Sequence, residues 1–181
     1  MKYMTFLKRI FIILLVVLCV FCSCKKSLAN CEELLMFSVK YGIENYADNG
    51  KVFLKNAEEG DAFFISDKIK KTMYGERFLE SLEKTEDFAI YVSASTPYEI
   101  AIFKCYSRND TENLLQMCYE RADELKVVLR FGKWESATKD ILIRGYKNYV
   151  VFLFTDSADR NEDIAYNLEN MISNQNSVVT Q

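Results

Sequence analysis

The sequence contains no histidine, a single proline and only six glycines among its 181 residues. The absence of histidine excludes Ser-His-Asp triads, histidine metal ligands and acid–base chemistry by imidazole. The scarcity of proline and glycine argues against long flexible linkers. Half of the residues are hydrophobic and 14% are aromatic, which is typical of a folded domain rather than a disordered stalk.

Cysteine is also sparse in the body of the chain, where only Cys31, Cys105 and Cys118 follow residue 24. An odd number of cysteines does not indicate a disulfide framework. One disulfide could form outside the cytoplasm, but buried thiols are the favoured interpretation. A nucleophilic thiol usually needs a partner such as histidine to lower its pKa. The sequence therefore predicts no catalytic residue, no metal site and no cofactor.

The first 23 residues have the organisation of an export signal. A basic start is followed by an unbroken apolar run of twelve residues, from Ile10 to Phe21, and a small residue, Ser23, precedes Cys24. A helix that spans a bilayer needs about 20 apolar residues, so a transmembrane anchor is disfavoured. The basic residues at the start are Lys2, Lys8 and Arg9.

The tetrapeptide Phe21–Cys24 resembles the lipobox of bacterial lipoproteins, in which the cysteine is acylated and becomes the new N-terminus. Phe21 departs from the pattern, because Leu, Val or Ile is usual there. The resemblance implies that Cys24 is the lipid attachment site and that membrane lipid is the first partner. Two or three acyl chains would hold the protein on the outer face of the cytoplasmic membrane, where one chain alone is marginal.

A second cleavage position competes with Cys24. Ser27-Leu28-Ala29 has the small-x-small pattern of an ordinary signal peptidase site. Cleavage after Ala29 would release a soluble protein that starts at Asn30. The charged pair Lys25-Lys26 close to this position favours the lipoprotein interpretation.

Removal of residues 1–23 would leave 158 residues, enough for one domain with its own core. It would remove three basic residues and change the net charge from -3 to -6. An acidic chain without a basic run is a poor nucleic-acid binder. We therefore expect a tether over 24–30, a single domain over 31–173 and a disordered polar tail over 174–181.

Hydrophobic periodicity predicts an α+β domain. We expect the order strand–strand–helix twice after residue 87, preceded by two helices. Such units can form one four-stranded antiparallel sheet with both following helices on one face, a two-layer sandwich. The predicted helices are 31–46, 61–74, 110–130 and one that begins near 156, and the predicted strands are 88–94, 98–106, 140–144 and 149–155.

The strands are nearly continuous in apolar residues, so the sheet face away from the two helices needs a cover. The two N-terminal helices are the expected cover. If they did not cover it, Tyr91, Phe103 and Val151 would form an exposed patch that could bind an envelope protein partner.

Two charged features are weaker candidates. Glu99 lies on a predicted strand, where a solvated or edge-protecting charge is the default interpretation and a ligand contact the alternative. Four acidic residues gather at the start of the last helix and complement its dipole. A calcium site would need a tight glycine-containing loop, which is missing there. These residues are Asp156, Asp159, Glu162 and Asp163.

Residues 61–173 resemble DUF4358, a bacterial family of uncharacterised lipoproteins. The matching segments are Pro97–Lys104 (PYEIAIFK), a helix of the type Glu112–Arg121, and Gly145–Phe152 (GYKNYVVF). The resemblance implies an exported, lipid-anchored domain of Gram-positive anaerobes of the clostridial kind. It implies no catalytic residues.

Together these observations predict a non-enzymatic binding or assembly module of the cell envelope. One alternative is a small-ligand-binding lipoprotein that is accessory to transport. A less favoured alternative is a carboxylate-based envelope hydrolase, which would need two acidic side chains about 5–10 Å apart in a cleft.

Overall fold

The computed structural model describes residues 30–43 and 50–176. The export signal, Cys24, the alternative cleavage position after Ala29 and the last part of the predicted tail lie outside the described residues. None of the helices in the described part of the chain combines the length and the apolar character needed to cross a bilayer.

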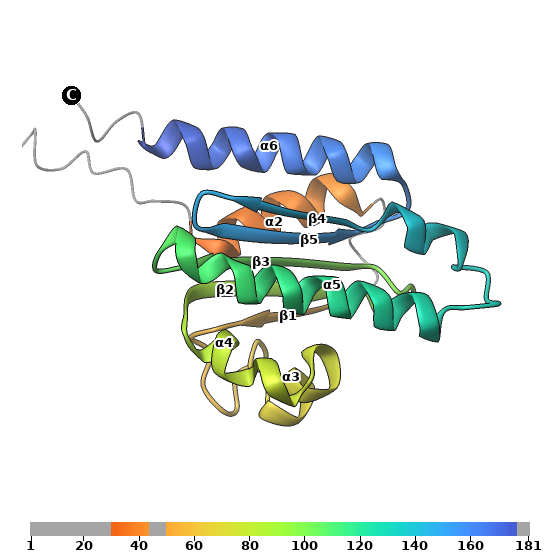
Figure 1. The fold of residues 1–181 in the computed structure, drawn as a ribbon, viewed down its shortest axis with the longest axis horizontal. Helices are drawn as coiled ribbons and strands as arrows, with labels where there is room; N and C mark the ends of the chain where they lie inside the picture. The colour runs from red at the N-terminus through yellow and green to blue at the C-terminus, as the bar shows by residue number, and fades with distance from the viewer. Residues whose placement is uncertain (1–29, 44–49, 177–181) are drawn as a thin grey trace, which may run out of the picture.

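Within the described residues, five strands form one antiparallel sheet in the order β1-β2-β3-β5-β4 (Figure 1). The α+β class and the presence of both predicted hairpins in one sheet are confirmed. The sheet has one strand more than predicted, because the short segment before residue 55 pairs with β2. The strands are β1 (Lys51–Leu54), β2 (Thr85–Val92), β3 (Glu99–Cys105), β4 (Leu142–Tyr146) and β5 (Tyr149–Phe154).

Helices cover both faces of this sheet. Successive side chains of a strand point to opposite faces, so Phe103 and Ile102 of β3 belong to two different hydrophobic clusters. On the Phe103 face lie α3 (Asp67–Tyr74), α4 (Leu79–Glu83) and α5 (Thr111–Val128). On the Ile102 face lie α2 (Cys31–Gly42) and α6 (Ala158–Asn176). In Figure 1, α5 lies in front of the sheet and α2 behind it.

The prediction that α5 and α6 share one face is wrong. Both faces of the strands are apolar, so each face needs a helix with an apolar stripe. α5 packs its stripe on one face and α6 packs on the other, beside α2. Of the two N-terminal helices, α2 covers the face of α6 whereas α3 joins the face of α5.

The predicted exposed patch does not exist. Tyr91, Phe103 and Val151 are only 1%, 0% and 2% exposed. Phe103 also lies on the opposite face of the sheet from Tyr91 and Val151. These residues are core, and a binding surface has to lie at the loops, the grooves or the edges of the sheet.

Several element ends differ from the predictions for local reasons. α3 begins at Asp67 rather than at residue 61, because the Ser66 side chain accepts a hydrogen bond from the Ile69 N–H and caps the helix there. α6 continues to Asn176, into the segment expected to be a tail. Short 3₁₀ turns at Glu76–Phe78, Arg108–Asp110 and Ser136–Asp140 complete the chain.

The apolar stripe of α5 supports a first prediction. Leu125 is 7% exposed and packs in the cluster that contains Phe103. Leu125→Ala should lower the free energy of unfolding by about 2–5 kcal/mol, because it removes buried methyl groups and leaves a cavity. Val127→Ala on the same helix, at a position 72% exposed, should change it by less than about 0.5 kcal/mol. Equal effects of the two substitutions in urea melts would show that the stripe is not core.

Candidate functional site

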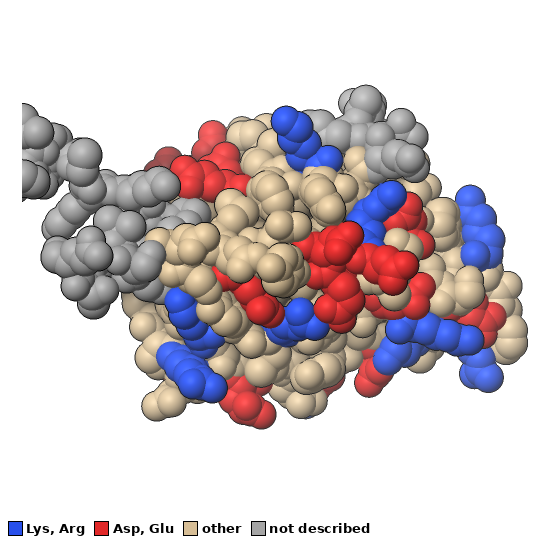
Figure 2. All heavy atoms as spheres, turned by 90° about the horizontal axis from the view of Figure 1, so that it is seen from above, with Lys and Arg blue, Asp and Glu red and all other residues tan. Residues whose placement is uncertain are grey.

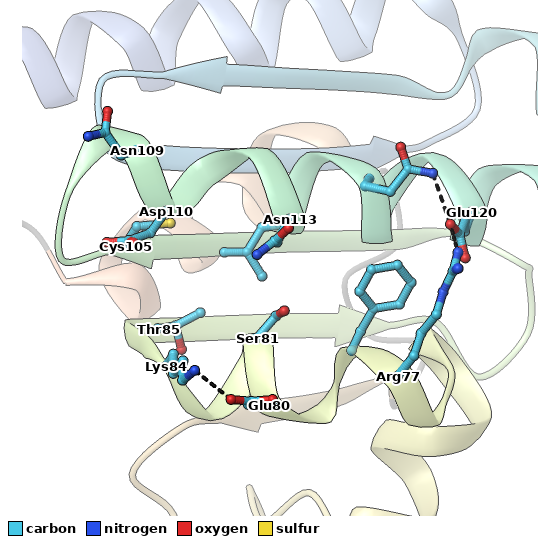
Figure 3. Close-up of a pocket in the computed structure, with 13 residues that line it drawn as sticks. Arg77, Glu80, Ser81, Lys84, Thr85, Cys105, Asn109, Asp110, Asn113 and Glu120 are labelled. Carbon is cyan, nitrogen blue, oxygen red and sulfur yellow. Dashed lines mark hydrogen bonds and ion pairs between the residues drawn. The ribbon is translucent and has the colours of Figure 1, made fainter.

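A polar groove of about 450 Å³ lies between α4 and α5 (Figure 3). Its floor is apolar and consists of buried side chains such as Phe78 and Leu114. Its walls are polar. Arg77, Glu80, Ser81 and Lys84 line the side of α4, and Asn109, Asp110, Asn113, Gln116 and Glu120 line the side of α5.

The wall on α5 follows from helical spacing. Asn113, Gln116 and Glu120 of α5 are separated by three and four residues, so they share one face of the helix, and Asn109 lies in the 3₁₀ turn just before it. The 3₁₀ turn Arg108–Asp110, which leads into α5, has a capping box, in which Asp110 accepts hydrogen bonds from the Ser107 hydroxyl at 2.8 Å and the Ser107 N–H at 3.1 Å.

The charged side chains of the groove are already paired. Arg77 of one wall forms an ion pair with Glu120 of the other. On α4, Lys84 Nζ lies 2.5 Å from Glu80 Oε1, and this hydrogen bond lowers the pKa of the Glu80 carboxyl. These pairs leave little charge for a ligand to neutralise.

Three uncharged polar side chains of the groove have no hydrogen-bond partner among the described residues. Among the hydrogen bonds of residues 30–43 and 50–176, none involves the side chains of Ser81, Asn109 or Asn113. The Gln116 amide donates to Glu120 Oε1 at 2.9 Å, and its side-chain carbonyl oxygen remains available to accept a hydrogen bond. Each amide offers both donors and acceptors, so the groove can hydrogen-bond a ligand that carries hydroxyl or amide groups.

Cys105 borders the groove, and its burial disfavours a role as a nucleophile. Its side chain is 1% exposed, and burial raises the pKa of the thiol to about 11, with Asp110 and Glu86 contributing. A thiol with that pKa is protonated at neutral pH and is unreactive. Cys31 and Cys118 are also buried free thiols with raised pKa values, as the sequence favoured.

We therefore predict slow alkylation of these three cysteines in the native protein. At pH 8, iodoacetamide should modify Cys31, Cys105 and Cys118 at least about tenfold more slowly than in guanidinium chloride, because only the unfolded chain exposes thiols with ordinary pKa values. Mass spectrometry of the peptides measures each site separately. Rapid modification of native Cys105 would contradict the burial described above.

A buried carboxylate lies beyond the Arg77 end of the groove. Glu99 is 1% exposed and accepts hydrogen bonds at Oε2 from Arg121 Nε at 3.0 Å and Nη2 at 2.9 Å. The Tyr74 hydroxyl donates to Glu99 Oε1 at 3.0 Å. Burial raises the pKa of Tyr74, and the Glu99 charge adds to this. Both oxygens of Glu99 are thus occupied by the protein itself.

The sequence-based interpretation of Glu99 as a solvated or edge charge is wrong. β3 is an interior strand, flanked by β2 and β5, and Glu99 points toward α3 and α5. Its contacts connect three elements, and its carboxylate has no oxygen left for a ligand. We assign it a structural role.

Two of the four acidic residues at the start of α6 form ion pairs. Asp156 pairs with Arg160 at 2.7 Å, and Glu162 pairs with Arg144 at 2.8 Å. In the described part of the chain, no three His, Cys, Asp or Glu side chains are grouped as a metal site.

The scan with protein-family models and the searches of curated proteins and of solved structures gave no match. The likeness to DUF4358 therefore stays a prediction. The candidate site is defined by its geometry, and it combines residues that the sequence did not predict as site residues: Ser81, Asn109 and Asn113.

Proposed function

We propose that this protein is a lipid-anchored, non-enzymatic binding module of the cell envelope, held on the outer face of the cytoplasmic membrane. The basic start, the apolar run and the Ser23-Cys24 pair support the anchor, and they lie outside the described residues. The groove between α4 and α5 supports the binding role.

The net charge of the groove decides which class of ligand we propose. In the groove, two cations, Arg77 and Lys84, face three carboxylates, those of Glu80, Asp110 and Glu120, which leaves a net charge of -1. A phosphate or carboxylate ligand would meet that excess negative charge and would have to displace existing ion pairs. An uncharged ligand with several hydroxyl or amide groups, such as a neutral glycan, fits the unpaired side chains better.

The same pairing favours binding over hydrolysis. A carboxylate hydrolase needs one carboxyl that donates a proton and one that remains available for attack or for activating water. Here Glu80 and Glu120 each pair with a cation, and Asp110 accepts two hydrogen bonds from Ser107. The groove is open and polar rather than enclosed and apolar, which also disfavours a carrier of apolar small molecules.

The test uses the full chain in a polyoxyethylene detergent, which carries no sugar headgroup, and a neutral oligosaccharide of N-acetylglucosamine as the probe. Binding should shift the NMR signals of the Asn109 and Asn113 side-chain amides. Asn113→Ala should weaken binding by about threefold to tenfold, the value of one or two hydrogen bonds. Asn170→Ala, at an exposed position on α6, is the matched control and should have no effect.

Two outcomes would overturn this proposal. One is an equal loss of affinity in the Asn113 and Asn170 variants, which would place the saccharide elsewhere. The other is tighter binding of a phosphorylated sugar than of the neutral one, which would contradict the charge argument.

A further inference from the structure

The free edge of β4 lies in a recess between α5 and α6. A hollow of about 500 Å³ at one end of the strand is lined by Tyr119 and Lys126 of α5, by Ile143 of β4 and by Glu162 of α6. A second hollow of about 450 Å³ lies at the other end, beside Leu115, Gly145 and Lys147. Gly145 itself is exposed.

The hydrogen-bond pattern of the sheet shows which backbone groups point out of this edge. The Cys105 N–H donates to the Asn148 oxygen at 2.7 Å, so the even-numbered residues of β5 bond to β3 and its odd-numbered residues bond to β4. The register Arg144↔Val151 then directs the even-numbered residues of β4 toward β5. The N–H and C=O groups of Ile143 and Gly145 therefore point away from the sheet.

Among residues 30–43 and 50–176, no group forms a hydrogen bond with these four outward-pointing groups. The opposite edge of the sheet differs, because the Leu54 N–H of β1 donates to the Phe63 oxygen at 3.0 Å. Unpaired groups at a sheet edge are a template for another strand. Peptides that add to such edges obtain affinity from main-chain hydrogen bonds and specificity from alternate side chains.

The wall formed by α5 offers apolar surface at Leu115 and Tyr119, and its charged residues Asp123 and Lys126 pair with each other at 2.9 Å. Ile143 is half-buried against the cluster on this side, and Tyr119 is 52% exposed. Gly145 has no side chain, and a Cβ built on it would lie 3.4 Å from Leu115 Cδ1. A glycine in a strand often marks the close approach of a ligand or another backbone. An apolar side chain of the partner fits against Leu115 at this point.

The wall formed by α6 is acidic. Glu162 and Glu169 share one cation, Arg144, at 2.8 and 3.4 Å. Asp159 and Asp163 are exposed and have no ion pair with any described residue. Asp159 and Asp163 line neither hollow, so the wall next to β4 has two carboxylates, Glu162 and Glu169, against one guanidinium, which leaves a charge of -1. Figure 2, which views the molecule from the side of α6, shows acidic side chains gathered near the middle of this face.

We propose that the β4 edge binds an extended segment of a partner protein in which apolar and basic residues alternate. The apolar side chains lie toward α5 and the basic ones toward α6. A second copy of this chain fits less well, because its own α5 and α6 flank its β4 edge and would meet the same helices. The inference is independent of the groove between α4 and α5 and of the lipid anchor.

The probe is a short fluorescent peptide of alternating lysine and valine, blocked at both ends, which is titrated with the full chain in a non-ionic detergent. We expect saturable binding that weakens as salt is added. The amides of Ile143 and Gly145 should exchange more slowly with deuterium when the peptide is bound, because they then donate to its carbonyls. A peptide of alternating glutamate and valine should bind at least about tenfold more weakly.

Two substitutions with matched controls locate the site. Gly145→Pro removes an outward N–H without touching the hydrogen bonds to β5, and it should weaken peptide binding at least about tenfold. Val52→Pro removes an outward N–H from the β1 edge and should leave the affinity unchanged. Glu162→Lys with Glu169→Lys should also weaken binding, because it removes the carboxylates beside β4, whereas Glu58→Lys with Glu59→Lys, near the β1 edge, should not.

Several outcomes would overturn the proposal. The first is no binding of the lysine–valine peptide at about 1 mM, which corresponds to a negligible affinity. The second is binding without added protection of Ile143 and Gly145, a readout in the unmodified protein that does not depend on the variants folding. The third is a dimer that Gly145→Pro abolishes, which would assign the edge to a second copy of the chain.

Discussion

Arg121→Met should lower the free energy of unfolding by about 3–5 kcal/mol, one of the largest effects expected in this protein. Arg121 donates two hydrogen bonds to Glu99, whose side chain is 1% exposed. Without Arg121, the carboxylate remains buried with only the Tyr74 hydroxyl as a donor. Leaving one member of a buried ion pair unpaired costs far more than the pair contributes.

Two further variants separate this cause from a general effect of mutating α5. Glu124→Ala removes the more exposed partner of Arg121 and should cost less than about 1 kcal/mol. The double variant Glu99→Met with Arg121→Met should recover most of the lost stability, since no unpaired charge remains. The fluorescence of Trp134, the single tryptophan, reports unfolding of the full chain in urea. A loss below about 1 kcal/mol in Arg121→Met would contradict the buried pair.

Cys24→Ala should abolish lipid attachment completely. The sulfur of Cys24 is the atom that would carry the diacylglyceryl group, and without it no acyl chain can hold the protein on the membrane. Incorporation of labelled fatty acid and partitioning into detergent measure the effect in the native host. Cys22→Ala is the matched control and should retain both.

The outcome also distinguishes the two cleavage positions. If the protein without substitutions incorporates no labelled fatty acid and starts at Asn30, the chain is processed by ordinary signal cleavage. Unchanged fatty-acid labelling in Cys24→Ala would contradict Cys24 as the attachment site.

The class of fold was predictable because it depends on local periodicity. The segments of β2, β3, β4 and β5 alternate with turn residues, and the stripe of α5 follows the helical period, so element type and order could be predicted. The assignment of helices to the two faces of the sheet was not predictable in the same way. A strand that is apolar on both faces does not specify which helix covers which face, and here α5 and α6 separated.

Most contacts of the candidate sites could not be predicted from the sequence. Arg121 lies 22 positions from Glu99, and no local pattern connects them. The spacing of Asn109, Asn113 and Gln116 is visible in the sequence, but the α4 wall that faces them arises only from packing. The recess at β4 required the strand order, because Ile143 and Gly145 point outward only if β4 is at the edge.

Site-resolved amide hydrogen exchange on the full chain tests the central claim that both faces of the sheet are covered while its β4 edge remains open. The amides of Phe103 and Val151 should exchange only through global unfolding, whereas those of Ile143 and Gly145 should exchange rapidly in the absence of a partner. Rapid exchange at Phe103 or Val151, or strong protection of Ile143 and Gly145 in the isolated protein, would contradict the account.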